Sequence, residues 1–182
     1  QLGDVIENNR TAIVECSHGV LTDSVTGLYP HVSAIRTLPR FAEKMLRIPY
    51  YRNISDTRYN LNPGTELTYG FLEDMFAEVA PAYSSPFMNI NCDETEGLGA
   101  GRAKGYVDSV GGADNAYCRH INRVYDILQR YNKTVMMWGD ILHEHPDRVK
   151  DIPKDVTLLN WYYEADAEQA EKRIRVFHDL DR

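Results

Sequence analysis

Apolar positions recur along this chain with a helical spacing in some segments and as short continuous runs in others. From Leu67 to Val79 the apolar side chains return at three- and four-residue steps, which predicts an amphipathic helix that ends before Pro81. The same spacing predicts helices over residues 115–131 and 166–180. Short apolar runs separate these helices, and we predict strands at Phe87–Cys92, Lys133–Trp138 and Val156–Trp161.

Two further elements are predicted near the start of the chain. The β-branched run Thr11–Cys16 predicts a short strand, and residues 38–51 predict a helix that begins at Pro39. Strands therefore alternate with helices, which is the pattern of βαβ units around a buried parallel sheet. Because no repeat or linker rich in Pro and Gly interrupts this pattern, we expect a single domain over residues 1–182. A doubly wound open sheet and a (β/α) barrel both fit, and both place functional groups at the carboxyl ends of their strands.

The composition limits the classes of function. The 182 residues are 43% hydrophobic and carry a net charge of −7 without a basic cluster, which argues against a nucleic-acid partner. No apolar stretch approaches the ~20 residues of a membrane helix and no signal-peptide pattern opens the chain, so we expect a soluble protein without a membrane partner. Three scattered cysteines are too few for a disulfide framework, and the compartment is not indicated.

The segment "FMNINCDETEGLGAGRAKG", Phe87–Gly105, joins a predicted strand to carboxylates and then to glycines. A dinucleotide site needs G-x-G-x-x-G, but the third glycine position is Arg102 or Lys104 in the two available registers. A phosphate loop would end in Gly-Lys-Ser/Thr, whereas a glycine follows Lys104. Carboxylates beside the loop would also repel a phosphate. We therefore interpret the acids as the functional groups and the glycines as bends that leave Glu94 uncovered.

The acid pair follows the predicted strand directly. Because side chains alternate across a strand, Asn91 and Asp93 are expected on the face opposite Ile90 and Cys92, with Glu94 on the rim just beyond. Like charges a few ångströms apart disfavour full ionisation, so one of two neighbouring carboxyl groups can carry a proton at neutral pH. A general acid and a fixed carboxylate are the minimum for cleaving a glycosidic bond. The spacing alone also allows a purely structural role, in which the acids cap a following helix.

Two aromatic residues favour the sugar interpretation. Trp138 and Trp161 are the only tryptophans, and each ends a predicted strand. The carboxyl ends of parallel strands lie at one edge of a sheet, so both indoles are expected at the level of the acid pair. Indole rings are suitable walls against which the apolar face of a sugar ring can stack.

These segments resemble glycoside hydrolase family 20, the β-N-acetylhexosaminidases, and within it the branch that includes hexosaminidase D. "FMNINCDETEGLG" is similar to the family's acid-pair segment, while "VMMWGDIL" and "LLNWYYEAD" are similar to its next two strands. Upstream, "MLRIPYYRNISD" and "YNLNPGTELTYGFLEDMFAEV" resemble the approach to the acid-bearing strand. The resemblance implies an α/β fold, a (β/α)₈ TIM-barrel catalytic domain of which this chain carries about strands 3 to 6 with their helices.

The resemblance also implies an activity. Family members remove terminal GlcNAc or GalNAc from glycans and glycoconjugates with retention, and the nucleophile is the substrate's own 2-acetamido oxygen. Glu94 would be the general acid and then the base, while Asp93 would orient the acetamido nitrogen and stabilise the oxazolinium intermediate. No metal and no cofactor are implied. The implied substrate-binding positions are Trp138, Trp161, Asp140, Tyr163, Glu164, Asn91 and His18.

The chain departs from the family pattern in two respects. The usual Gly-Gly before the acid pair is Asn91-Cys92 here, and His18 in "ECSHGVL" stands among neighbours that match poorly. Barrels of this type take ~250 residues, so further sugar-binding residues would lie on strands outside this chain. We therefore expect a partial barrel, completed either by the remainder of its own domain in a longer chain or by another chain, and the sequence leaves open whether it is active alone or is an inactive fragment.

Two other functions remain open from the sequence. His143 and His145 form an H-x-H that could hold zinc in a barrel hydrolase, although such sites need further ligands at other strand ends. A carbohydrate-binding or scaffold domain of the same fold would keep the pocket without turnover. Affinity for sugar that survives replacement of Glu94 would identify the second alternative.

Overall fold

The computed structural model describes residues 53–57 and 59–178 of the chain. By its internal contacts the chain divides into residues 1–52 and 53–182, and the description below concerns the second unit alone. The predicted strand Thr11–Cys16, the predicted helix over residues 38–51 and the candidate His18 lie outside the described residues. The expectation of a single domain over residues 1–182 therefore stays a prediction.

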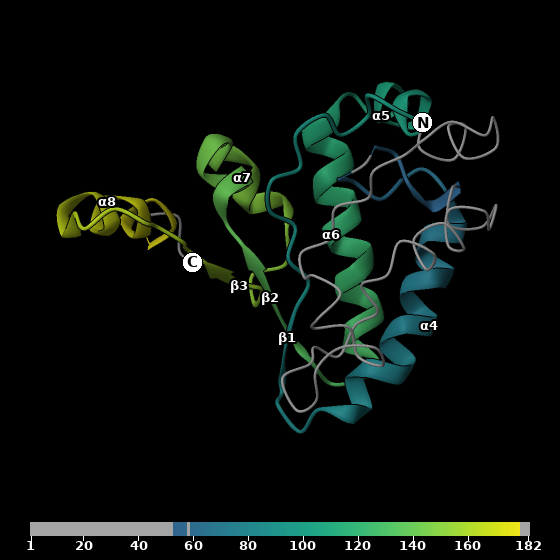
Figure 1. The fold of residues 1–182 in the computed structure, drawn as a ribbon, viewed down its shortest axis with the longest axis horizontal. Coiled ribbons are helices and arrows are strands. Elements are labelled where there is room, and N and C mark those ends of the chain that lie inside the picture. The colour runs from purple at the N-terminus through teal and green to yellow at the C-terminus, as the bar shows by residue number, and fades with distance from the viewer. Residues whose placement is uncertain (1–52, 58, 179–182) are drawn as a thin grey trace, which may run out of the picture. The chain divides into compact units, whose positions relative to one another are not determined.

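A three-stranded parallel sheet forms the centre of this unit (Figure 1). Its strands are β1 (Phe87–Asn89), β2 (Thr134–Trp138) and β3 (Thr157–Leu159), in that order across the sheet. Asn89 pairs with Met136, and Trp138 pairs with Leu159. Because helices lie between successive strands in the chain, this arrangement confirms the predicted α/β pattern with a parallel sheet.

The strands are shorter than the apolar runs predicted. β1 ends at Asn89, although the Ile90 N–H still donates to the Met136 carbonyl at 2.9 Å. Beyond this point Asn91 and Cys92 have φ angles of 61° and 67°. Extended backbone requires negative φ, so the expected side-chain alternation through Asp93 is wrong beyond Ile90.

The longest helices are α4 (Glu66–Ala82) and α6 (Ala113–Gln129), which pack against each other. The Thr65 side chain caps α4 by accepting from the Leu67 N–H at 3.4 Å. Pro81 lies inside the last turn of α4, so the prediction that this helix ends before Pro81 is wrong by two residues. A proline this close to the end removes one late backbone hydrogen bond only.

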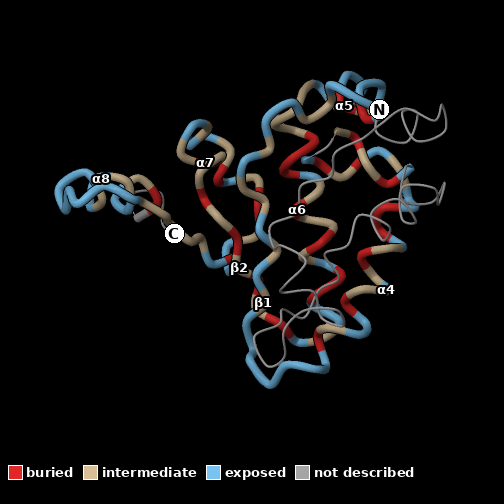
Figure 2. Tube along the Cα trace, in the orientation of Figure 1, coloured by how far each residue is buried: buried red, intermediate tan, exposed pale blue. Residues whose placement is uncertain are grey.

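The hydrophobic core lies between the sheet and these two helices. Val135 and Met137 of β2 are fully buried, whereas the alternate residues of that strand, Met136 and Trp138 among them, are partly exposed. Figure 2 shows the buried positions of α4, α6 and β2. One face of the sheet therefore packs against helices, as period-two alternation requires. The most deeply buried members of the core are Ile121, Leu128, Val135, Met137 and Leu142.

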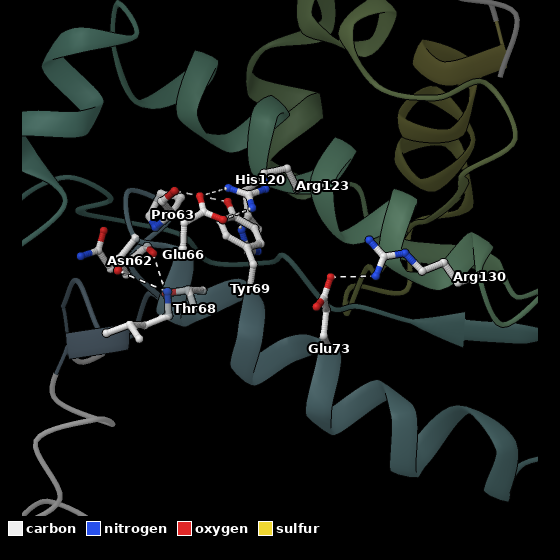
Figure 3. A network of polar contacts seen from close by, with 11 residues as sticks. Asn62, Pro63, Glu66, Thr68, Tyr69, Glu73, His120, Arg123 and Arg130 are labelled. Carbon is white, nitrogen blue, oxygen red and sulfur yellow. Dashed lines mark hydrogen bonds and ion pairs between the residues drawn. The ribbon is translucent and has the colours of Figure 1, made fainter.

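Polar side chains join α4 to α6 across the surface of this core (Figure 3). Arg123 donates to both carboxylate oxygens of Glu66, at 2.7 and 2.6 Å, and its guanidinium lies 3.5 Å from the centre of the Tyr69 ring. About two helical turns further on, Arg130 pairs with Glu73 at 2.8 Å. Exposed ion pairs of this kind each contribute less than about 1 kcal/mol, so they fix the orientation of the helices more than they stabilise the fold.

Four short elements complete the unit. Two of them, α5 (Lys104–Ser109) and α7 (Asp140–Glu144), were not predicted from the sequence. The 3₁₀ helix η2 (Pro146–Asp151) begins with a proline, whose fixed φ suits the first position of a helix. The last helix, α8 (Ala167–His178), is capped by Asp166, whose Oδ1 accepts from two backbone N–H groups at 3.1 Å.

None of the helices within residues 53–57 and 59–178 combines the length and hydrophobicity that crossing a bilayer requires.

Candidate active site

The acid pair and both tryptophans follow the carboxyl ends of neighbouring strands. Trp138 is the last residue of β2 and pairs with Leu159, and Trp161 lies two residues beyond the end of β3. The Trp138 N–H donates to the Asn91 carbonyl at 2.9 Å, which sets Asn91 at the level of Trp138. Asp93 and Glu94 come directly after this level.

Asp93 faces a cavity of about 300 Å³ at the end of β1. Its carboxylate is half-buried, and Asn91 lines the same cavity. The remaining lining comes from three places, the loop before α4, the acid segment itself and the amino-terminal half of α6: Tyr59, Asn60, Leu61, Pro63, Ile90, Cys92, Thr95, Leu98, Tyr117 and His120. Trp138, Trp161 and Glu94 are not among the described residues that line this cavity.

Glu94 is exposed and its backbone is held by Asp140. The Glu94 N–H donates to Oδ2 of Asp140 at 3.0 Å, from the first turn of α7. Oδ1 of Asp140 is buried and has no hydrogen-bond partner among the described residues. Buried carboxylate oxygens are seldom left unpaired in folded proteins.

Two aromatic residues beyond β3 lie close to each other. The rings of Trp161 and Tyr163 have centroids 5.3 Å apart and are tilted by 40°, while the Tyr163 side chain is 88% exposed. Glu164 is exposed beside them. Exposed aromatic surface next to a carboxylate is suited to sugar binding, and the role that the family resemblance implies for Trp161, Tyr163 and Glu164 stays a prediction. The structure does not join this aromatic pair to the cavity at Asp93.

Tyr117 is a contact of the acid segment that the sequence analysis did not identify. It lies on α6, is 4% exposed, and donates its hydroxyl to the Cys92 carbonyl at 2.9 Å. Burial raises the pKa of Tyr117 far above its ordinary value, and the negative charges of Asp140 and Asp93 add to the effect, so the hydroxyl remains a donor. Burial, and to a smaller extent the charges of Asp93 and Asp140, raise the pKa of the Cys92 thiol to about 12. This thiol therefore stays protonated and unreactive.

The glycine-rich loop is held by a buried carboxylate that was also missed. Asp56 is 2% exposed and accepts from the backbone N–H groups of Gly99 at 2.5 Å, Gly101 at 3.0 Å and Ala103 at 2.8 Å. These are the kind of donors that a phosphate loop would offer to a ligand, and here they bind the chain's own acid. Asn60 adds a hydrogen bond to the Glu96 carbonyl at 3.0 Å. The loop after the acid pair is therefore fixed from the segment before α4.

His143 and His145 have separate partners. Nε2 of His143 lies 3.1 Å from Oδ1 of Asn160, and its ring lies against Phe177 with centroids 4.2 Å apart. Nδ1 of His145 lies 3.4 Å from Oδ2 of Asp114. Within the described part of the chain, no three His, Cys, Asp or Glu side chains are grouped so that they could hold a metal ion. The geometry gives no support to the zinc alternative.

Protonation of the His120 ring is expected to make the stability of the fold depend on pH. Tyr69 donates its hydroxyl to the Pro63 carbonyl at 3.3 Å, so its oxygen is left to accept from Nδ1 of a neutral His120 ring, also at 3.3 Å. Burial, and then the charge of Arg123, lower the pKa of His120 to about 4, below the ~6.5 of an unfolded chain. Between pH 4 and 6.5 the His120 ring is protonated in the unfolded chain and neutral in the folded protein. The free energy of unfolding that the neutral ring contributes is therefore lost as the pH falls from 6.5 to 4.

The measurement is urea unfolding of the wild type and of His120→Gln at pH 7 and at pH 4.5. We expect the wild type to lose at least about 1 kcal/mol more than the variant between these pH values, because glutamine cannot titrate. Carboxylates titrate equally in both proteins and cancel in the comparison. Equal losses would contradict the assignment of this pH dependence to His120.

The chain matches a protein-family model and is similar to solved structures. The family model described as "Glycosyl hydrolase family 20, catalytic domain" matches residues 30–178. Among solved structures, the chain is similar to a GH20 exo-β-N-acetylglucosaminidase from Vibrio harveyi, crystallised in complex with N-acetylglucosamine. The identity is 21% and the TM-score 0.49, and the match covers 63% of this chain but 18% of that one. The chain thus spans less than a fifth of the length of that protein. A search of curated protein sequences gives no match.

Proposed function

Because the chain belongs to glycosyl hydrolase family 20, whose catalytic domain is a TIM barrel, we propose that it is part of a retaining exo-β-N-acetylhexosaminidase. The three parallel strands and their helices are then a portion of that (β/α)₈ barrel. The observation that carries the proposal is the position of Asp93 and Glu94. The family match spans them, they follow the carboxyl end of the parallel strand β1, and Asp93 lines a cavity. Catalytic groups of TIM barrels occupy this end of the strands.

In the proposed mechanism the substrate supplies its own nucleophile. The 2-acetamido oxygen attacks the anomeric carbon while Glu94 protonates the glycosidic oxygen, so the bond to the leaving sugar breaks and an oxazolinium ion forms. Asp93 accepts a hydrogen bond from the acetamido N–H and offsets the positive charge of the ring. Glu94, now ionised, takes a proton from water, which attacks the anomeric carbon and restores the acetamido group with retention.

The remaining candidate residues have supporting roles in this proposal. Trp138, Trp161 and Tyr163 offer aromatic surface to the sugar and its N-acetyl group, while Asn91 and Glu164 offer polar contacts. Asp140, which the resemblance implies as a substrate-binding position, lies beside the acid pair and accepts from the Glu94 N–H. His18 stays a candidate outside the described residues. No residue in this scheme requires a metal or a cofactor. The substrate is a glycan or glycoconjugate that ends in β-linked GlcNAc or GalNAc, bound by the barrel together with its remaining strands.

We also propose that the chain belongs to the hexosaminidase D-like branch. Two features of the acid segment support this assignment: Cys92 directly before the acids, and Leu98-Gly99 shortly after them. Asn91-Cys92 replaces the Gly-Gly that is usual elsewhere in the family, and both residues have positive φ, the conformation that glycines adopt most readily.

The proposal is tested with two chromogenic substrates that differ in one group. We expect the protein, purified with its barrel complete, to release 4-nitrophenol from the N-acetyl-β-glucosaminide but not from the matching β-glucoside, because the glucoside lacks the acetamido nucleophile. Equal turnover of both would contradict substrate assistance. A carbohydrate-binding protein would bind N-acetylglucosamine and release no product, and its affinity would not change with Glu94→Gln. That result would favour the binding alternative.

A further inference from the structure

The backbone through the acid pair has an irregular conformation. Asn91, Cys92 and Glu94 have φ angles of 61°, 67° and 47°. Residues with a side chain seldom adopt positive φ, and three within four positions are less common still. Such conformations persist where the surrounding structure fixes them, and they gather at functional sites. The contacts that fix this segment therefore bear on where the two carboxylates point.

Two side chains from outside the segment hold the peptide groups on either side of Asp93. The hydroxyl of Tyr117, on α6, donates to the carbonyl of the peptide that precedes Asp93, at 2.9 Å. The carboxylate of Asp140, in α7, accepts from the N–H of the peptide that follows Asp93, at 3.0 Å. One contact is a donor and the other an acceptor, and each matches the backbone atom that it meets. Both peptide planes that determine the direction of the Asp93 side chain are thus bonded to helices that follow in the chain.

We propose that Tyr117 and Asp140 are positioning residues that hold the backbone on both sides of Asp93 and thereby orient Asp93 and Glu94 for glycoside cleavage. This inference rests on the function proposed above and assigns to Tyr117 a role that no motif suggests. Tyr117 acts through the Cys92 carbonyl, and Asp140 acts through the Glu94 amide.

Both positioning residues are themselves well fixed. The Tyr117 ring is buried in the core cluster beside Cys118 and Ile121, so its hydroxyl has little freedom to point elsewhere. Asp140 follows Gly139, whose N–H donates to the Leu159 carbonyl at 2.9 Å and so ties the start of α7 to β3. The position of the acid pair is in this way fixed relative to the core helix α6 and to the strand β3. A misplacement of about 1 Å in a catalytic group costs about 100-fold in rate, so such support affects turnover more than binding.

The first test compares two tyrosines on the same helix. Tyr117→Phe keeps the ring and removes the hydroxyl. Tyr125→Phe is the matched control, since among the described residues its hydroxyl bonds the exposed Asp155 carboxylate alone, at 2.7 Å. We expect Tyr117→Phe to lower kcat by about 10- to 100-fold with KM within about threefold of wild type. Tyr125→Phe is expected to match wild type in both constants.

The second test separates hydrogen bonding from charge at Asp140. Asp140→Ala removes the acceptor for the Glu94 N–H, whereas Asp140→Asn keeps an acceptor oxygen of the same shape. We expect kcat to fall by about 100-fold in the alanine variant and to recover by at least about 10-fold in the asparagine variant. Equal losses in the two variants would overturn the positioning role of Asp140.

Amide hydrogen exchange at Glu94 provides a readout that does not depend on activity. We expect this amide to exchange at least about 10-fold faster in Tyr117→Phe and in Asp140→Ala than in Tyr125→Phe. If wild type hydrolyses the N-acetyl-β-glucosaminide, unchanged kcat or unchanged Glu94 exchange in Tyr117→Phe overturns the inference. If wild type hydrolyses nothing, the proposed function fails, and the exchange comparison alone decides whether these residues hold the segment.

Discussion

Glu94→Gln is expected to lower kcat for release of a terminal N-acetylhexosamine by about 10²- to 10⁴-fold, the range of a positioned general acid and base. Glutamine has nearly the same shape but cannot transfer a proton. The Glu94 side chain is exposed, and within residues 53–57 and 59–178 its carboxylate has no hydrogen bond or ion pair. The substitution should therefore leave the free energy of unfolding unchanged. Steady-state kinetics and urea unfolding on the same samples check both statements.

The choice of leaving group makes this experiment more specific. Nitrophenolate departs with little protonation, whereas a sugar alkoxide needs a proton from the general acid. We therefore expect Glu94→Gln to impair a disaccharide that ends in N-acetylglucosamine more than the 4-nitrophenyl glycoside. Glu96→Gln is the matched control, since Glu96 is also exposed and lies two residues further along the same segment. If Glu96→Gln lost as much activity as Glu94→Gln, the assignment of Glu94 as the proton donor would be wrong.

Gly101→Ala is expected to destabilise the protein by about 3 kcal/mol, the largest stability effect that we predict for one methyl group. A Cβ atom at Gly101 would lie 2.0 Å from the Asp56 carbonyl oxygen and 2.8 Å from Oδ1 of Asp56. The neighbouring atoms are backbone and a buried carboxylate, so neither can move aside. Relief of the clash would break the hydrogen bond from the Gly101 N–H to Asp56 and disturb the bonds to Gly99 and Ala103.

Gly105→Ala is the control for this prediction, because no atom of the described residues lies within 4 Å of a Cβ atom at that position. Gly105 lies in α5, so alanine should stabilise the protein by about 0.5 to 1 kcal/mol through its higher helix propensity. Urea unfolding of both variants gives the difference directly. If Gly101→Ala were as stable as wild type, the close packing of the glycine loop on Asp56 would be refuted.

The loop measurements also bear on the acid pair. Asp56 and Asn60 hold the chain that leaves the acid pair, since they bond backbone atoms from Glu96 to Ala103. A variant that loosens this loop should lose activity as well as stability, whereas Glu94→Gln should lose activity alone. The two variants therefore distinguish a damaged scaffold from a missing catalytic group.

Several features of the fold could be predicted from the sequence because they are local. The helices near 66–82 and 113–129 come from apolar side chains repeated every three to four residues, and the strands come from short apolar runs. The order of the strands and their parallel direction follow from the helices between them. That order is sufficient to bring the ends of the Asp93 and Trp138 segments to one edge of the sheet.

The ends of the strands and the supports of the site could not be predicted in this way. β1 stops at Asn89 because Asn91 and Cys92 adopt positive φ, although the apolar run continues in the sequence. Tyr117 bonds a carbonyl 25 residues away, and Asp56 bonds an amide 43 residues away. A hydrogen bond between distant residues leaves no periodic signal, and a lone tyrosine on an apolar helix face is indistinguishable from an ordinary core residue.

By itself, then, the sequence determined the long helices and the three strands, and it predicted the Asp93-Glu94 pair as the catalytic centre. Only the tertiary structure decided how that pair is held. Tyr117 and Asp140 bond the backbone of the acid segment, and Asp56 bonds the backbone of the glycine loop. The physical reason is the range of the interactions. Periodic burial depends on neighbours within a few residues, whereas the direction of a carboxylate depends on backbone hydrogen bonds to groups that approach only when the chain has folded.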